Sequence, residues 1–164
     1  MIKSVDHFGI AVSNLENAIE FFTNCLGFKM KGSIRTSKGK QVDETMQMPN
    51  VLIRVCFLTF PDSEEVVGEL HEYVEPRGKS IDLTLCNFGV THIGFKVNNI
   101  EKMYEDLTAK GVVFNNKPKW LKLDGVKKNG AFCICYLKGP DGITIEFMEN
   151  ADVGDNGEII KHVS

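Results

Sequence analysis

Four side chains that could bind a divalent metal ion recur at matching places in two halves of the chain. His7 and His92 each lie near the start of an apolar segment, and Glu69 and Glu146 each lie within a later one. Imidazole nitrogens and carboxylate oxygens are common ligands of divalent first-row metals. Two neighbouring carboxylates repel each other, which raises the pKa of one of them unless a cation neutralises both. These residue types therefore indicate a metal centre.

Glu146 lies in a segment that predicts a strand buried on both faces. The sequence Gly-Pro-Asp-Gly at 139–142 predicts a turn, because proline presets φ and glycine accepts a positive φ. Residues 143–148 follow as a strand, with mostly apolar side chains on both faces. A lone charged carboxylate is costly there. We therefore expect Glu146 to be protonated, paired with a cation or bound to a metal.

A purely structural explanation exists for each of these side chains taken singly. A histidine near the start of a strand is most often structural, and a glutamate on a strand often pairs with a cation, for which Arg54 is available. Because two histidines and two glutamates occupy matched positions of the two halves, a metal site is favoured over these separate explanations. His71, on the same strand face as Glu69, is a competing ligand, but the second half has no histidine at that place. His162 lies in the tail and is expected to be solvated.

The matched positions come from an internal duplication. The sequence DHFGIAVSNLE at 6–16 aligns with THIGFKVNNIE at 91–101, and ELHE at 69–72 aligns with EFME at 146–149. The first half is longer than the second, and the polar stretch 36–50 is where we place the excess. Such self-similarity predicts two copies of one supersecondary unit, here a strand, a helix and three further strands.

The first module is predicted to turn its apolar side chains toward its helix and His7 toward the opposite face. A capping box at Ser13-x-x-Glu16 begins the helix, and Gly27 ends it. The stretch 36–50 is predicted to contain a short helix. The expected elements are strands over 5–12, 28–34, 51–60 and 66–73, and the short helix around 43–48.

The second module repeats this order, with a helix that ends at Gly111. Between the helix and the last strand lie the segments 112–116, 118–122 and 130–137, with a loop at Asp124-Gly125. The chain after Asn150 is polar and glycine-containing, so it need not be ordered. The expected fold is α+β, with two tandem βαβββ modules forming a cupped mixed sheet and helices on its outer face. We expect a single domain over 1–150, made of modules at about 5–75 and 90–149, and a C-terminal tail over 151–164.

Composition excludes several classes of protein. The chain has 164 residues, 43% of them hydrophobic, which suffices for one domain core. A net charge of −3 disfavours a nucleic-acid partner. The sequence contains neither a signal-peptide pattern nor an apolar run long enough to span a membrane. Five cysteines in apolar strand patterns predict reduced, buried thiols in a cytoplasmic protein, and Cys133 and Cys135 alternate faces, which argues against a disulfide or a metal pair.

The chain resembles the vicinal oxygen chelate superfamily, which includes glyoxalase I, methylmalonyl-CoA epimerase and the extradiol dioxygenases. The likeness covers about residues 5–149, and its motifs are specific for the superfamily but not for one reaction. They are Asp-His-Phe-Gly-Ile at 6–10, Leu-Gly-Phe at 26–28, Glu-Leu-x-x-Tyr at 69–73, Thr-His-Ile-Gly-Phe at 91–95, and Gly-Pro-Asp-Gly-Ile-x-Ile-Glu at 139–146.

The resemblance implies a divalent metal ion inside the cupped sheet. His7, Glu69, His92 and Glu146 match the four ligand positions, and nickel, zinc, cobalt, manganese and iron are all compatible with them. Relatives pair their modules within one chain or across two, which implies a homodimer here. The implied partner is a small-molecule substrate.

The resemblance implies a metal-dependent lyase or isomerase of the glyoxalase I (lactoylglutathione lyase) or epimerase type. Such enzymes transfer a proton at a carbon next to a metal-bound oxygen through an enediolate or enolate, and Glu146 or Glu69 is the expected base. The epimerase usually has glutamine at the place of Glu69. The substrate is not readable from the sequence. Four side chains could line the cup and meet an acidic or flat substrate, although each is more often a surface or packing residue: Arg35, Arg54, Trp120 and Lys122.

Two other functions are alternatives. An Fe(II) extradiol-type dioxygenase uses two histidines and one carboxylate, so a fourth protein ligand argues against it. An antibiotic-binding or resistance protein is the second alternative. Bleomycin-sequestering relatives lack the ligand set, and fosfomycin-modifying relatives use three protein ligands, so both differ from this chain.

Overall fold

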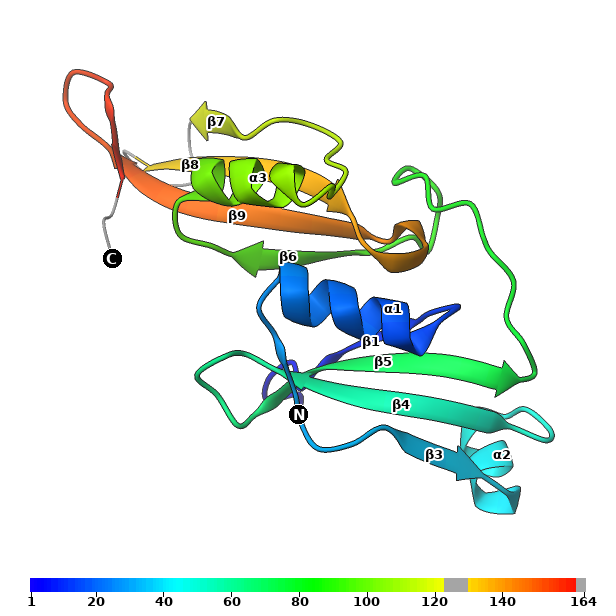
Figure 1. Cartoon of the computed structure of the whole chain (residues 1–164). Coiled ribbons are helices and arrows are strands. Elements are labelled where there is room, and N and C mark those ends of the chain that lie inside the picture. The colour runs from blue at the N-terminus through cyan, green and yellow to red at the C-terminus, as the bar shows by residue number, and fades with distance from the viewer. Residues whose placement is uncertain (123–129, 162–164) are drawn as a thin grey trace. The chain divides into compact units, whose positions relative to one another are not determined.

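A computed structural model describes residues 1–122 and 130–161 of the chain (Figure 1). The chain divides into two compact units, Met1–Asp82 and Leu83–Ser164. Each unit has its own five-stranded mixed sheet. The predicted α+β class and the two tandem modules are confirmed, with the strands hydrogen-bonded into one sheet per module. None of the helices in the described part of the chain is long and apolar enough to cross a membrane.

The first module follows the order of strand, helix and further strands. Its sheet has the order β1-β5-β4-β2, and β3 also pairs with β4. Only β1 and β5 run parallel, while the other strand pairs are antiparallel. The elements are β1 (Phe8–Ala11), α1 (Leu15–Glu20), the π-helical turn η1 (Phe21–Cys25), β2 (Lys29–Met30), β3 (Arg35–Lys38), α2 (Lys40–Met46), β4 (Leu52–Thr59) and β5 (Val66–Glu75).

The second module repeats the parallel pairing of its first and last long strands. Its sheet has the order β10-β9-β8-β7, with β6 parallel to β9. Thus β6 and β9 correspond to β1 and β5. The elements are β6 (His92–Lys96), α3 (Ile100–Ala109), β7 (Lys119–Lys122), β8 (Gly130–Lys138), the 3₁₀ turn η2 (Pro140–Gly142), β9 (Thr144–Val153) and β10 (Ile159–Lys161).

Several element boundaries in the first module differ from the prediction. The strand predicted from residue 5 begins at Phe8, so His7 lies just before it. The predicted capping box at Ser13 is wrong, because the side chain of Asn14 accepts the backbone N–H of Asn17 at 2.8 Å. The predicted strand 28–34 is reduced to Lys29–Met30. The stretch 36–50 overlaps the edge strand β3, and its helix begins three residues earlier than predicted.

The second module differs most at its C-terminal end. Segment 112–116 forms only a bridge between Phe114 and Leu137. The prediction that the chain after Asn150 need not be ordered is wrong for residues 151–161, because β9 continues to Val153 and pairs with β10. The predicted loop at Asp124-Gly125 and the tail residue His162 lie outside the described residues.

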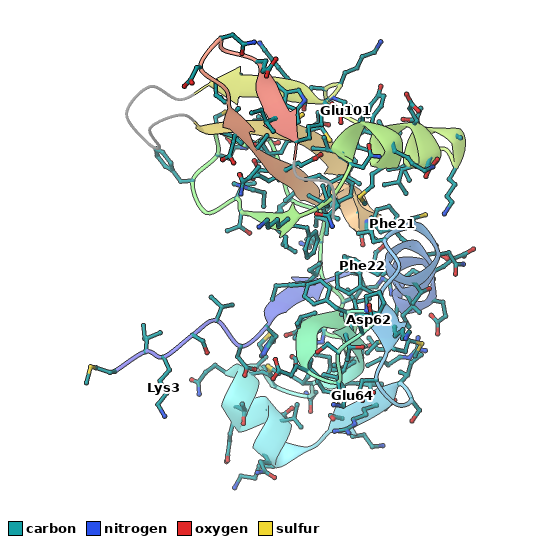
Figure 2. All side chains as sticks on the ribbon, turned by 90° about the vertical axis from the view of Figure 1, so that its left-hand side faces the viewer. Lys3, Phe21, Phe22, Asp62, Glu64 and Glu101 are labelled. Atoms are coloured by element: carbon teal, nitrogen blue, oxygen red, sulfur yellow. The ribbon has the colours of Figure 1, made fainter. Side chains whose placement is uncertain are left out.

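The helices α1 and α3 each pack on the sheet of their own module. Leu15, Ala18 and Phe22 are fully buried, and α1 packs on β4 and β5. Figure 2 shows Phe21 and Phe22 on η1, which continues α1. In the second module, Ile100 and Leu107 are buried where α3 packs on β9. Burying each large apolar side chain contributes about 1.5–3 kcal/mol, so these helices are held mainly by their apolar faces.

Charged groups on the helix side hold α1 to its sheet. The guanidinium of Arg54 donates to Glu72 Oε2 at 2.6 Å and also pairs with Glu16 at the start of α1. Arg54 therefore lies on the face away from Glu69, because Glu69 and Glu72 alternate along β5. The sequence-based possibility that Arg54 neutralises Glu69 is thus wrong.

A corresponding polar cluster anchors α3 in the second module. Glu101, in the first turn of α3 (Figure 2), accepts hydrogen bonds from the Trp120 indole at 2.9 Å and from Lys161 at 2.6 Å. The buried Glu149 carboxylate accepts the backbone N–H of Ile100 at 2.7 Å. Trp120 thus packs beside the helix rather than in a substrate cup, and Lys161 ties the C-terminal strand β10 to the module.

The cysteines differ in their reactivity. Cys56, Cys133 and Cys135 are buried and reduced, but Cys86 is exposed and Cys25 is half-buried, so the predicted burial of all five thiols is wrong. Burial raises the pKa of the Cys135 thiol to about 12 and those of Cys56 and Cys133 to about 11. We expect Cys86 to be alkylated first at neutral pH, because only an accessible thiolate reacts. Peptide mapping after brief iodoacetamide treatment measures this order, and faster labelling of Cys135 than of Cys86 would contradict it.

Candidate metal centre

The first module places one imidazole beside one carboxylate. In the parallel pair of β1 and β5, Gly9 lies opposite Glu69. His7, two residues before Gly9, has its Nε2 atom 3.4 Å from Glu69 Oε2. The other ring nitrogen, Nδ1, lies 2.8 Å from the Asp6 carboxylate. A carboxylate on one ring nitrogen typically orients a metal-binding histidine through the other.

The pKa of the His7 imidazole is raised above its ordinary value. The main cause is the hydrogen bond to Asp6, and the negative charge of Glu69 adds to it, while partial burial acts in the opposite direction. The two carboxylates therefore favour the protonated form of the ring. A metal ion competes with a proton for Nε2, because only the neutral imidazole is a ligand.

His71 also meets Glu69. Its Nε2 atom lies 3.0 Å from Glu69 Oε2, and its ring makes an edge contact with Tyr73 at 6.5 Å between centroids. Both histidines of this module thus approach the same carboxylate oxygen. His71, which the sequence indicates as a competing ligand, is therefore a direct neighbour of the Glu69 carboxylate.

The second module repeats the pairing with different neighbours. Gly94 lies opposite Glu146 across β6 and β9, and His92 Nε2 is 3.1 Å from Glu146 Oε2. Glu146 is buried, as its strand predicted, with 8% of its surface exposed. A Cβ atom on Gly94 would lie 3.4 Å from Glu146 Oε2, so the glycine two residues after His92 leaves space for the carboxylate.

Tyr136 belongs to this second cluster, and the sequence analysis missed it. It lies opposite Glu146 in the antiparallel pair of β8 and β9. Its phenol interacts electrostatically with the Glu146 carboxylate, and its ring meets the His92 ring edge-on at 5.9 Å. Burial, together with the charge of Glu146, raises the pKa of Tyr136. The alternation of β8 was readable from the sequence, but its register against β9 was not.

The two clusters supply donor types that fit a divalent ion. Each module by itself presents an imidazole nitrogen and a carboxylate oxygen within 3.4 Å of each other, His7 with Glu69 and His92 with Glu146. Residues 1–122 and 130–161 contain no group of three or more His, Cys, Asp or Glu side chains arranged as a complete metal site. The structure therefore brings the four predicted ligands together as two pairs.

Of the side chains considered for substrate contact, Arg35 lies on the same side as the first pair. Its guanidinium stacks over the Phe57 ring at 5.1 Å, and Phe57 lies opposite Glu69 across β4 and β5. The side chain of Lys122 lies outside the described residues. Arg35 thus lies on the sheet face that carries Glu69.

Known proteins resemble this chain in sequence or in fold. The chain is 26% identical to lactoylglutathione lyase of Escherichia coli O157:H7 over 149 residues, which is 90% of this chain and 93% of that one. It is 28% identical to the uncharacterized protein YwbC of Bacillus subtilis, covering 91% and 99% of the two chains. A glyoxalase family protein from Bacillus cereus has the same fold, with a TM-score of 0.72, 22% identity, and coverage of 92% and 95%.

The family model extends over both clusters. It matches residues 4–147 and so includes His7, Glu69, His92 and Glu146. This match agrees with the duplicated modules and with the two histidine–glutamate pairs, since all of them indicate the same superfamily. The chain belongs to the glyoxalase/bleomycin resistance protein/dioxygenase superfamily.

Proposed function

We propose that the protein is a metal-dependent lyase or isomerase of the glyoxalase I or epimerase type. The observation that carries this proposal is the repeated histidine–glutamate pair, His7 with Glu69 at 3.4 Å and His92 with Glu146 at 3.1 Å. Curated relatives named lactoylglutathione lyase, including that of E. coli O157:H7 at 26% identity, support the same class. The proposed ligands of the ion are these four side chains.

The donor set suits chemistry without a change of redox state. A bound divalent ion would act as a Lewis acid, polarising a substrate oxygen and stabilising negative charge that develops beside it. The protein's own part is proton transfer, for which a carboxylate must lie within hydrogen-bond reach of the substrate carbon. Glu69 and Glu146 are the candidates, and their side chains are 21% and 10% exposed.

Burial distinguishes the two carboxylates from ordinary surface glutamates. Glu69 lies against two imidazoles, while Glu146 lies against one imidazole and one phenol. Arg35, stacked on Phe57, is proposed to attract an acidic part of the substrate.

A substrate screen of the metal-loaded protein tests this function. The panel contains hemithioacetals, 2-methyl-branched acyl-CoA thioesters and catechols, assayed in D₂O by NMR for exchange of the α-proton. We expect metal-dependent exchange with a hemithioacetal or a thioester. Oxygen consumption with a catechol and Fe(II) would instead indicate a dioxygenase. Tight ligand binding without exchange or metal dependence would indicate a binding protein.

We also propose that the protein forms a homodimer. In the first module, β1 is an edge strand of its sheet, and edge strands offer backbone groups that a second copy can pair with. Sedimentation velocity at micromolar concentration measures the assembly. We expect a dimer, and a monomer at all concentrations would contradict this part of the proposal.

A further inference from the structure

We propose that Tyr136 is a positioning residue for Glu146, and that it makes the second histidine–glutamate pair unlike the first. The inference rests on the proposed function, since it concerns how one of the proposed metal ligands is held. Three observations place Tyr136 there. It lies opposite Glu146 across β8 and β9, its ring lies edge-on to His92 at 5.9 Å, and its phenol interacts with the Glu146 carboxylate, to which we infer that it donates a hydrogen bond.

The duplication supplies an internal comparison. Phe57 lies opposite Glu69 across β4 and β5, as Tyr136 lies opposite Glu146 across β8 and β9. Phe57 carries no hydroxyl and instead stacks with Arg35 at 5.1 Å. The phenol hydroxyl of Tyr136 is therefore a specific addition in the second module, at a position where the first module has the same ring without the hydroxyl.

The two carboxylates are held by different donors. Glu69 meets His71 Nε2 at 3.0 Å, and His71 lies two residues further along the same strand. The corresponding place after Glu146 is Met148, which has no hydrogen-bond donor in its side chain. In the proposed arrangement, Tyr136 on the neighbouring strand thus supplies the side-chain donor for Glu146 that His71 supplies for Glu69.

The physical effect of the phenol is to restrict the rotation of the Glu146 carboxylate. Glu146 is 8% exposed, so little water is available to satisfy its oxygens. In the proposed arrangement the phenol donates to one acceptor site of the carboxylate, and Oε2 faces His92 Nε2 at 3.1 Å. A carboxylate whose orientation is set in advance loses less freedom when it binds an ion, and removing such an outer hydrogen bond typically weakens metal binding about 10- to 100-fold.

The first experiment measures metal affinity in the full-length protein. Tyr136→Phe removes only the hydroxyl, and Tyr104→Phe is the matched control, because Tyr104 packs from α3 on Phe114, which meets Phe147 on the strand face opposite Glu146. Cobalt(II) is titrated into each protein and followed by visible absorption. We expect about 10- to 100-fold weaker binding and an altered spectrum for Tyr136→Phe, with Tyr104→Phe like the wild type. If Tyr136→Phe keeps the wild-type affinity and spectrum, the inference is wrong.

A second experiment needs no metal and separates the inference from the proposed function. A double-mutant cycle of Tyr136→Phe and Glu146→Ala is measured by thermal unfolding of the metal-free protein. We expect the two effects not to add, because both substitutions remove the same hydrogen bond. Additive effects would overturn the inference even if the wild type binds cobalt. A coupled pair in a wild type that binds no metal would overturn the proposed function and leave Tyr136 as the partner that positions Glu146.

Discussion

Replacing His92 with alanine is expected to weaken binding of a divalent ion by more than about 100-fold, since loss of a ligand should exceed the loss caused by outer-shell changes. His92 Nε2 lies 3.1 Å from Glu146 Oε2, and the substitution leaves that buried carboxylate without its imidazole neighbour. Inductively coupled plasma mass spectrometry after reloading, and calorimetric titration with manganese, measure the loss. Lys96→Ala is the matched control, because Lys96 is an exposed residue on the same strand.

Metal removal should also lower the thermal stability of the wild type. An ion that binds only the folded state, at a free concentration of about 100 times its dissociation constant, adds about 2.7 kcal/mol. Chelation should therefore reduce the melting temperature of the wild type and of Lys96→Ala, but hardly that of His92→Ala. A wild type whose stability and metal content are unaffected by chelation and reloading would contradict the proposed centre.

The same measurement decides the role of His71. Because His71 Nε2 meets Glu69 Oε2 at 3.0 Å, it orients that carboxylate in the proposed arrangement. His71→Ala should then weaken metal binding less than His92→Ala. An equal loss would make His71 a direct ligand and require a revised ligand set.

Replacing the catalytic base with glutamine is expected to reduce α-proton exchange by about 10²- to 10⁴-fold, the usual contribution of a positioned acid or base. Glu69→Gln and Glu146→Gln should differ in this respect. Glutamine keeps the shape and one oxygen ligand but cannot accept the proton from carbon. The variant at the base should therefore retain metal and lose exchange, whereas the variant at a purely positional ligand should mainly lose metal.

Exchange and metal content are measured on the same samples, by NMR in D₂O and by elemental analysis. Glu75→Gln is the control, because this substitution makes the same chemical change at an exposed position of β5. If both site variants retain metal and full exchange, neither carboxylate is the base. Loss of metal from both would show that both are ligands and would not identify the base.

Local patterns in the sequence were sufficient to predict the modules and the faces of their strands. The repeat of His-x-Gly at 7–9 and 92–94 located equivalent strands, and the alternation along β5 separates Glu69 from Glu72. These features depend on residues close together in the chain, whose side chains alternate with a period of two. The α+β class followed from the same short-range information.

Partners across strands depended on register, which the sequence did not reveal. Arg54 was available to neutralise Glu69 in principle, but the antiparallel register of β4 and β5 places it beside Glu72. Tyr136 meets Glu146 because β8 pairs with β9 in one particular register. A shift of one residue would turn every side chain to the other face, so such contacts follow only from the assembled sheet.

The sequence by itself determined that two histidines and two glutamates occupy equivalent positions of a duplicated α+β unit. Only the tertiary structure decided their neighbours on other strands: His7 beside Glu69, His92 beside Glu146, and Tyr136 opposite Glu146. It also decided that residues 159–161 form a strand on this module, because β10 pairs with β9 and Lys161 meets Glu101 across 60 positions of the chain. Contacts between residues so distant depend on packing of the whole module, and local propensity carries no information about them.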